Sequence, residues 1–304
     1  MAETTAGITP DLERRAIDVI RGLAMDAPHA ARSGHQGTAM ALAPLAHVLW
    51  TRIMRYDAAA PEWPDRDRFI LSCGHASILQ YAMLHLTGYD VSLDDLRQFR
   101  QWGSATPGHP EAGHTPGVEV TTGPLGQGFA NGVGMAIAEQ SLRARFGSDV
   151  CDHHIYALVS DGDLSEGVSH EAASLAGHLG LGRLVYVYDD NRITIDGGAD
   201  LSLTDDAVRR FEAYGWHVLQ LGEASEDLDA MTEALEAARD EQDRPSLVVL
   251  RSHIGHPSPE HTDSPAAHGL AFGVEDITSA KEVMGLPDEP FHLPDDVVAM
   301  YREA

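Results

Sequence analysis

The sequence predicts an α/β fold, with one doubly wound, mostly parallel sheet that has helices on both faces. Apolar runs at 154–159, 184–188 and 246–250 are continuous rather than alternating, as strands buried on both faces require. Helix-like stretches separate these runs, and the first two runs lie about one βαβ unit apart. Both of these end in polar residues, so we expect polar side chains at the carboxyl edge of the sheet.

Each element follows from its local pattern. Apolar residues at helical spacing predict helices over 11–31, 39–53, 76–86, 126–146 and 227–239, and another that starts near Leu164. Short apolar runs predict strands over 69–71, 154–159, 184–188, 216–221 and 246–250.

Two segments are expected to lack regular structure. Residues 100–128 are rich in Gly, Pro and Thr, and a loop of that length inside a compact domain is usually functional or disordered. Its histidines favour function. Residues 276–304 are acidic, contain prolines and have weak periodicity. We therefore expect one α/β domain over 1–275, followed by an acidic surface tail or partner-contacting arm over 276–304.

Composition argues against several classes of protein. The net charge is −26 with a single lysine, Lys281, so nucleic acid and anionic membranes are not expected as partners. No secretory signal is visible, and no apolar run approaches the roughly 20 residues that span a bilayer. Cys73 and Cys151 are too few and too far apart in sequence to suggest a disulfide or a zinc knuckle. A cytoplasmic enzyme is the default.

Oxygen ligands follow two of the predicted strands. Asp161 comes after the run 154–159, and Asn191 comes after the run 184–188. Each alone is explained better by a helix cap or a turn than by a metal. As a pair at one sheet edge, with a nearby backbone carbonyl, they suit a hard cation such as Mg²⁺. The helix near Leu164 can direct N–H groups at a phosphate, so the sequence predicts a metal-bridged diphosphate site.

The same stretch resembles the thiamine-diphosphate motif, and more narrowly the amino-terminal half of transketolases. Four further segments resemble that family in order: 33–37 (SGHQG), 65–75 (DRDRFILSCGH), 107–128, and 268–273 (HGLAFG). The resemblance covers roughly residues 10–275. It implies the thiamine-diphosphate-binding fold, with thiamine diphosphate and Mg²⁺ (or Ca²⁺) as cofactors. It also implies transfer of a two-carbon ketol unit from a ketose donor to an aldehyde acceptor.

The resemblance assigns roles to the cofactor-binding residues. Those for the metal are Asp161, Asn191 and the backbone carbonyl of Ile193; those for the diphosphate are Gly162, His75 and His268; and those for the aminopyrimidine ring are Gly123 and Leu125.

Four histidines match family histidines that contact the diphosphate, orient substrate hydroxyls and move protons. Imidazole suits these tasks because its pKa is close to neutrality. His75 and His268 are expected nearest the phosphates, and His35 and His109 nearest the sugars. The other histidines that we considered are expected to be packing or surface residues (His29, His47, His85 and His178), while a role for His114 is open.

Three positions near the diphosphate motif raise questions. Glu166 matches a family glutamate at the subunit interface, thought to connect paired active sites, but a glutamate in a first helical turn is an equal explanation. Ser160 stands where the family usually has Gly. Asp163 adds negative charge near an anion, so it is expected to weaken cofactor binding unless it points away.

The resemblance also implies missing parts. In this family the glutamate that activates the aminopyrimidine, and the arginines that bind the substrate phosphate, lie in a following pyrimidine-binding domain. The chain is therefore a fragment or one subunit of a split enzyme. We expect the latter, with a pyrimidine-domain partner chain in an α₂β₂ assembly. The alternatives are a subunit of a deoxyxylulose-phosphate synthase or 2-oxoacid dehydrogenase, and a non-catalytic transketolase-like subunit.

Overall fold

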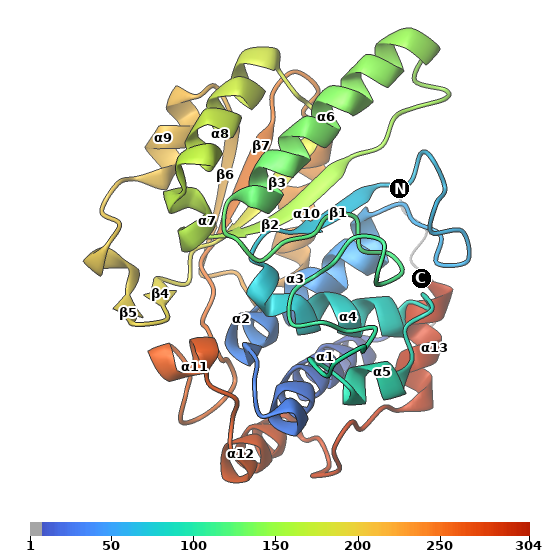
Figure 1. The fold of residues 1–304 in the computed structure, drawn as a ribbon, viewed down its shortest axis with the longest axis vertical. Helices are drawn as coiled ribbons and strands as arrows, with labels where there is room; N and C mark the ends of the chain where they lie inside the picture. The colour runs from blue at the N-terminus through green and yellow to red at the C-terminus, as the bar shows by residue number, and fades with distance from the viewer. Residues whose placement is uncertain (1–7) are drawn as a thin grey trace.

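Five strands form a single parallel sheet in the order β1-β2-β3-β7-β6 (Figure 1). The computed structural model describes residues 8–304. The strands are β1 (Arg68–Leu71), β2 (Ile155–Ser160), β3 (Leu184–Asp189), β6 (His217–Gly222) and β7 (Ser246–Leu250). Each lies where the sequence predicts a strand, and β2, β3 and β7 are the continuous apolar runs.

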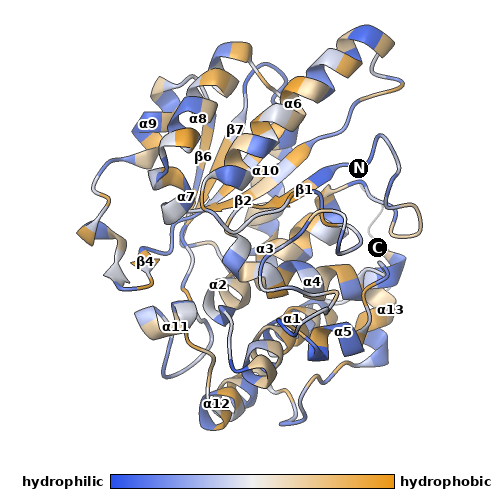
Figure 2. Ribbon diagram, viewed as in Figure 1, coloured by the Kyte–Doolittle hydropathy of each residue, from blue (hydrophilic) through white to orange (hydrophobic). Residues whose placement is uncertain are grey.

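The central strands are buried on both faces. In β2, Tyr156 and Leu158 belong to one hydrophobic core, whereas Ile155, Ala157 and Val159 belong to the other. This alternation places an apolar side chain on each face at every step, which explains the unbroken apolar run. Figure 2 shows the strands as the most apolar part of the molecule.

Helices cover both faces, which confirms the predicted doubly wound arrangement. Apolar residues of the helices on one face share a core with the sheet, and those on the other face form the second core (Figure 1). The first face carries α1 (Pro10–Ala31), α3 (Ala43–Val48), α4 (Ser77–Leu86) and α10 (Leu228–Asp240), and the second carries α6 (Gln127–Phe146), α8 (Gly167–Leu179) and α9 (Ala207–Ala213).

The segment predicted as one helix over 39–53 is divided. It forms α2 (Gln36–Ala41), then α3, then a π-helical turn, η1 (Leu49–Ile53). Pro44 causes the break after α2, because it has no N–H to donate to the carbonyl of Met40. The Nε of Arg21 on α1 donates to that carbonyl at 3.2 Å instead. The prediction of one continuous helix is therefore wrong.

Several short elements were not predicted. They are η2 (Gly74–Ala76), α5 (Leu93–Arg97), α7 (Asp161–Ser165), β4 (Ile193–Thr194), β5 (Gly197–Gly198), η3 (Ala199–Leu201) and α11 (Pro265–Gly269). The long loop is found, and it runs irregularly from α5 to the start of α6.

The last thirty residues do not form the predicted surface tail. They contain most of α12 (Val274–Met284) and all of α13 (Asp295–Glu303). Lys281 is 2% exposed, and its Nζ lies 2.9 Å from Oδ1 of Asp26 on α1. Tyr301 of α13 is 1% exposed in the core of the first face. Each helix buries apolar residues on one side and exposes acidic residues on the other. Contact with a partner chain remains a prediction for this segment.

Candidate functional site

Asp161 lies at the carboxyl end of β2, where it begins α7. The residue is 6% exposed, and its Oδ1 accepts a hydrogen bond from the Tyr188 hydroxyl. Its Oδ2 is buried and has no partner. Burial raises the pKa of this carboxyl, although the Tyr188 hydroxyl opposes the shift. A buried carboxylate oxygen without a donor is unusual, and a cation would compensate it.

Asn191 follows β3, the neighbouring strand, and is 4% exposed. Its Nδ2 donates to Oδ2 of Asp189 at 2.7 Å, and its Oδ1 accepts from the N–H of Ile193 at 2.9 Å. Asp189 therefore fixes which end of the amide faces the loop that contains Ile193. Burial raises the pKa of Asp189 to about 7. We did not single out Asp189 from the sequence, although it stands two residues before Asn191.

The predicted metal ligands lie at the ends of adjacent strands, because Ser160 of β2 pairs with Asp189 of β3. In addition to burial, the carboxylate of Asp190 raises the pKa of Asp161, and the carboxylates of Asp161 and Asp190 raise the pKa of Asp189. A divalent cation would relieve this repulsion and would pair with the free oxygen of Asp161. The donor set therefore fits Mg²⁺ or Ca²⁺.

Three histidines from distant segments lie in contact. His35 precedes α2, His75 lies in η2, and His268 lies in α11. The ring centroids are 5.3 Å apart for His35 and His75, 5.7 Å for His35 and His268, and 4.8 Å for His75 and His268. Nε2 of His75 and Nδ1 of His268 are buried without partners. Ring nitrogens in this state can bind an anion.

These histidines are held in the neutral form. Burial, followed by the charge of Arg100, lowers the pKa of His35 to about 4. Burial and the neighbouring histidines lower the pKa of His75 well below its ordinary value, and burial alone lowers that of His268. A phosphate placed among the rings would reverse these shifts, because it would stabilise the charged form.

Arg100 lies next to this cluster and was not singled out from the sequence. One of its terminal nitrogens lies 3.3 Å from Nδ1 of His35 and 3.4 Å from the carbonyl oxygen of Gly108. Arg100 has a positive φ of 62°. Its position gives the site a fixed positive charge in a chain with one lysine.

His109 lies on the long loop, which packs against the turn of His75. A Cβ on Gly123 would lie 3.3 Å from the His109 ring, and a Cβ on Gly74 would lie 2.5 Å from Oγ1 of Thr122. Burial and Arg100 lower the pKa of His109. The glycines therefore allow the loop to approach both histidines.

The histidine cluster and the metal-ligand loop are neighbours. A Cβ on Gly269, the residue after His268, would lie 3.3 Å from Ile195 in the β4–β5 turn and 3.6 Å from the ring of His35. The segment that follows Asn191 thus lies against the histidines. The carboxyl edge therefore brings the predicted metal ligands and the predicted diphosphate histidines into one region.

Gly162 lies against the long loop, whereas Glu166 lies at the surface of this chain. A Cβ on Gly162 would lie 2.7 Å from Cδ1 of Leu125, so the space beside this glycine is occupied by the leucine side chain. Glu166 is exposed between α7 and α8. A Cβ on Gly126 would lie 2.7 Å from Cβ of Glu166. The structure thus leaves Glu166 at the surface, where only another chain or segment could bury it.

A model of the family described as transketolase, thiamine diphosphate binding domain, matches residues 12–304. The chain belongs to this family. The match extends beyond residue 275, where our estimate of the resemblance ended, so the last two helices belong to the family domain as well. Of the described residues, none form a helix both long and apolar enough to cross a membrane.

Curated relatives and solved structures agree with this assignment. The chain is 50% identical over 300 residues to a transketolase of Nostoc sp., covering 97% of this chain and 45% of that protein. It superposes on a Pichia stipitis transketolase in complex with sedoheptulose-7-phosphate with a TM-score of 0.93 and 44% identity, covering 96% of this chain and 44% of that one. For the Campylobacter jejuni transketolase the TM-score is 0.94, with 40% identity and coverage of 97% and 46%. The chain therefore spans less than half the length of these transketolases.

The two departures from the transketolase pattern contact each other. Asp163 is completely buried, and it points into the protein rather than toward the carboxyl edge. Its carboxylate accepts from the Ser72 hydroxyl at 2.6 Å and from the Gly126 N–H at 2.8 Å. It also accepts from the N–H and hydroxyl of Ser160 at 2.9 and 3.0 Å. These four hydrogen bonds compensate its charge inside the protein. Asp163 therefore points away from the diphosphate region, and under that condition we did not expect it to weaken cofactor binding.

The remaining histidines that we considered have the following contacts. His47 is 1% exposed between Tyr301 and Glu13, and His85 and His29 contact the backbone carbonyls of Val91 and Phe272. These are packing roles, as expected. His114 contacts the carbonyl oxygen of Ser104 on the long loop, and His178 is exposed on α8.

Proposed function

We propose that this chain binds thiamine diphosphate through Mg²⁺ (or Ca²⁺) and forms the diphosphate-binding part of a transketolase. The reaction is transfer of a two-carbon ketol unit from a ketose donor to an aldehyde acceptor. When bound, the cofactor supplies the ylid and the electron sink, and the protein supplies binding, orientation and electrostatics. Sugar phosphates are the proposed substrates, since a related Pichia stipitis structure contains sedoheptulose-7-phosphate.

One observation carries this proposal. The unpaired, buried Oδ2 of Asp161 lies at the same sheet edge as the unpaired ring nitrogens of His75 and His268. A protein that left these groups empty would lose stability for each of them. A divalent cation bound to a diphosphate would satisfy the carboxylate and the imidazoles together.

The proposed roles are those that the family resemblance implies, and the contacts of Asp189 support that of Asn191. Asp161, Asn191 and the carbonyl of Ile193 hold the metal, with Asp189 orienting the amide of Asn191. His75 and His268 bind the diphosphate. The aminopyrimidine ring lies on the loop of Gly123 and Leu125, and Gly162 keeps the backbone close to the diphosphate region.

The remaining histidines act on the sugars in this proposal. His35 and His109 orient the substrate hydroxyls and move protons, because neutral imidazoles can both donate and accept. Burial, together with the charge of Arg100 beside His35, holds these rings neutral until an anion enters.

We further propose that a separate pyrimidine-domain chain completes the enzyme in an α₂β₂ assembly. Support comes from the surface of α6 and α8, where Ile137, Leu142, Leu175 and Leu179 are 36, 42, 44 and 39% exposed. Apolar side chains gathered on neighbouring helices favour contact with another polypeptide. Glu166, near the start of α8, would lie at that contact. A cytoplasmic location stays a prediction.

Two measurements test the proposal. Calorimetric titration with thiamine diphosphate should give binding that requires Mg²⁺, and no binding under any metal condition would contradict it. Ketol transfer from a ketose phosphate should then require a pyrimidine-domain chain in addition to this one. Full activity of the purified chain alone would exclude the two-component part of the proposal.

The alternatives give different outcomes. Turnover of pyruvate with release of CO₂ would favour a deoxyxylulose-phosphate synthase or a 2-oxoacid dehydrogenase. Absence of cofactor binding in the assembled complex would favour a non-catalytic subunit. The transketolase proposal is preferred because the family and its relatives are transketolases.

A further inference from the structure

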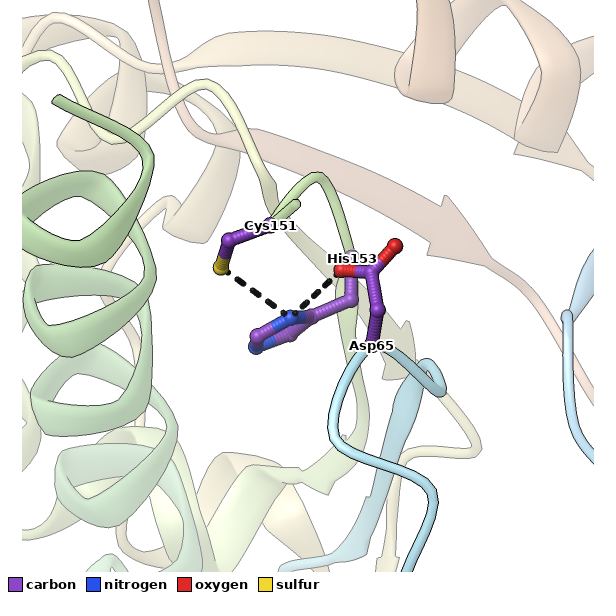
Figure 3. Close-up of side chains that lie close together, drawn as sticks. All are labelled: Asp65, Cys151 and His153. Atoms are coloured by element: carbon purple, nitrogen blue, oxygen red, sulfur yellow. Dashed lines mark hydrogen bonds and ion pairs between the residues drawn. The ribbon is translucent and has the colours of Figure 1, made fainter. Parts of the chain in front are cut away.

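Three ligand atoms converge at the amino edge of the sheet, opposite the carboxyl edge. Asp65 lies shortly before β1, and Cys151 and His153 lie shortly before β2. Oδ1 of Asp65, Sγ of Cys151 and Nδ1 of His153 all lie within 4.8 Å of one another (Figure 3). Among residues 8–304 no other group of His, Cys, Asp and Glu meets this spacing. The proposed transketolase function makes no use of these residues.

Two of the three spacings match a tetrahedral zinc site. Sγ of Cys151 lies 3.6 Å from Nδ1 of His153, and that nitrogen lies 3.2 Å from Oδ1 of Asp65. Zinc bonds of about 2.3 Å to sulfur and about 2.0–2.1 Å to nitrogen and oxygen, at tetrahedral angles, place S and N about 3.6 Å apart and N and O about 3.3 Å apart. The third pair, sulfur and carboxylate, lies within 4.8 Å, so any adjustment on zinc binding falls on this pair.

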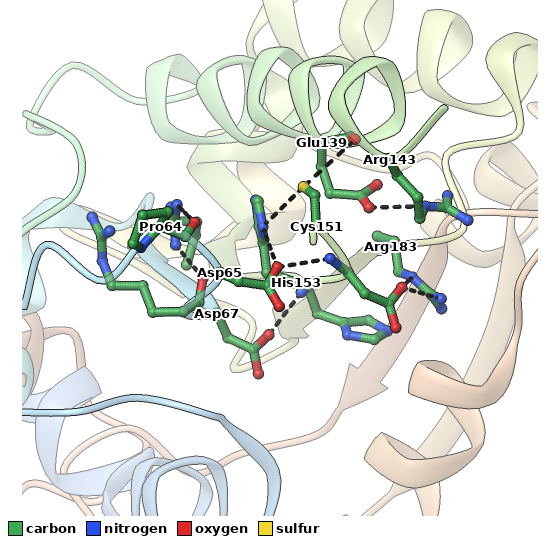
Figure 4. A network of polar contacts seen from close by, with 12 residues as sticks. Pro64, Asp65, Asp67, Glu139, Arg143, Cys151, His153 and Arg183 are labelled. Atoms are coloured by element: carbon green, nitrogen blue, oxygen red, sulfur yellow. Dashed lines mark hydrogen bonds and ion pairs between the residues drawn. The ribbon is translucent and has the colours of Figure 1, made fainter. Parts of the chain in front are cut away.

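The polar contacts of the cluster hold the three ligand atoms in place. Oδ1 of Asp65 accepts from the N–H of Asp152 at 2.7 Å, which fixes the carboxylate (Figure 4). Nδ1 of His153 faces both Oδ1 of Asp65 and Sγ of Cys151, but it can donate only one hydrogen. The sulfur has only one other contact, the carbonyl oxygen of Glu139 at 4.0 Å.

Burial and charge around the cluster are compatible with a cation. Cys151 and His153 are 6% and 5% exposed, and the side chain of Asp65 is 20% exposed, which leaves access for a water ligand. Arg55 lies 3.7 Å from both Oδ2 of Asp65 and Oδ1 of Asp67, and Arg68 lies 4.0 Å from Glu119. Oδ1 of Asp65, which faces His153, is the oxygen that would bind the metal.

We propose that Asp65, Cys151 and His153 bind a zinc ion, with water as the fourth ligand. Binding replaces the thiol proton of Cys151, which is released to solvent, and the thiolate bonds to the metal. The ion would join the segment before β1 to the segment before β2, on the side of the sheet away from the proposed cofactor. A mixed sulfur, nitrogen and oxygen ligand set favours Zn²⁺ over Mg²⁺ or Ca²⁺.

Cobalt substitution tests this site directly. Co²⁺ added to the reduced, metal-free chain should give a thiolate-to-cobalt charge-transfer absorption that Zn²⁺ then displaces. The oxygen and histidine ligands of the carboxyl edge cannot give that band, since they contain no sulfur. The expected stoichiometry of tightly bound Zn²⁺, measured by elemental analysis after dialysis, is a single equivalent.

Variants separate this site from others. Cys151→Ser should abolish the band, and Asp65→Asn, which keeps an acceptor for the Asp152 N–H, should weaken Co²⁺ affinity at least tenfold. Cys73→Ser is the matched control, because Cys73 is also buried but contacts the Leu158 carbonyl instead, and it should leave the band unchanged. No band in the unsubstituted chain, or an unchanged band in Cys151→Ser, would overturn the proposal. Failure of thiamine diphosphate binding would leave it unaffected.

Discussion

The carboxylate of Asp163 accepts hydrogen bonds from both the backbone N–H and the hydroxyl of Ser160, at 2.9 and 3.0 Å. These residues form a capping box at the start of α7. They are also the two positions that depart from the transketolase pattern beside the diphosphate motif. Each of these two residues therefore supplies a hydrogen-bond partner for the other. The same carboxylate ties Ser72, at the end of β1, to Gly126 on the long loop.

Asp163→Ala should destabilise the chain by about 3 kcal/mol, because it leaves the buried N–H groups of Ser160 and Gly126 without acceptors. Urea unfolding monitored by circular dichroism measures this loss. Ser160→Gly removes only the hydroxyl bond and should cost about 1 kcal/mol. Asp206→Ala, which removes an exposed cap from α9, is the matched control at about 1 kcal/mol. Equal costs for Asp163→Ala and Asp206→Ala would contradict the proposed internal role.

The sequence was sufficient to predict the sheet, because buried parallel strands leave continuous apolar runs that few other structures produce. The pairing of Asp161 with Asn191 at one edge followed from the same geometry. The orientation of Asp163 was not predictable, since its partners Ser72 and Gly126 are distant in sequence. Arg100 was missed for a related reason, because it acts through His35, which only the folded chain places beside it. Asp189 stands two residues before Asn191, so the sequence did offer a signal for it.

The two helices after residue 273 were not predicted from the sequence, for a different reason. The apolar stripe of α12 is weak, whereas α13 places Val297, Met300 and Tyr301 on one buried face and was overlooked among its acidic residues. Ile277 and Ala280 of α12 share a core with α1, and the ion pair of Lys281 with Asp26 joins the same two helices. No periodicity argument detects a buried ion pair.

Lys281→Met should destabilise the chain by about 3–5 kcal/mol, because it leaves the carboxylate of Asp26 buried without its cation. The carboxylate keeps one donor, the N–H of Phe291 at 2.7 Å. The double variant Asp26→Leu with Lys281→Met should recover a large part of the loss. Thermal unfolding of the three variants gives the comparison. A loss below about 1 kcal/mol for Lys281→Met would mean that the pair behaves as a surface salt bridge.

His35→Gln should change how stability depends on pH. The pKa of His35 is lowered from 6.5 to about 4 in the folded chain. Between these values the unfolded chain binds a proton that the folded chain does not, so this histidine lowers stability as the pH falls from about 6.5 toward 4. The variant should therefore gain stability relative to the unsubstituted chain at pH 5 but not at pH 7.5. Urea midpoints at both pH values test this, with His178→Gln on α8 as control. An equal difference at both pH values would contradict it.

Asp161→Asn should separate binding from stability. Burial raises the pKa of Asp161, so at neutral pH its ionised form costs free energy in the folded, metal-free chain. This cost decreases as the pH falls through the raised pKa of the folded chain, and it is gone below the ordinary value near 4. The variant should therefore be at least as stable as the unsubstituted chain at pH 7, yet bind thiamine diphosphate and Mg²⁺ at least tenfold more weakly. Tyr188→Phe removes the donor to Oδ1 but keeps the carboxylate. It should lower the stability of the chain, while weakening cofactor binding much less than Asp161→Asn. Calorimetry and urea unfolding measure the two effects.

Glu166→Gln tests whether the exposed glutamate acts only in the assembly. In this chain Glu166 is exposed between α7 and α8, so the substitution should change the unfolding free energy by less than about 0.5 kcal/mol. If Glu166 meets a second chain as proposed, ketol transfer by the reconstituted complex should fall at least tenfold, while thiamine diphosphate binding to this chain alone stays unchanged. Glu171→Gln, an exposed residue one turn further along α8, is the matched control. Unchanged turnover with Glu166→Gln would assign the residue to its alternative role, a glutamate favoured by the first turn of a helix.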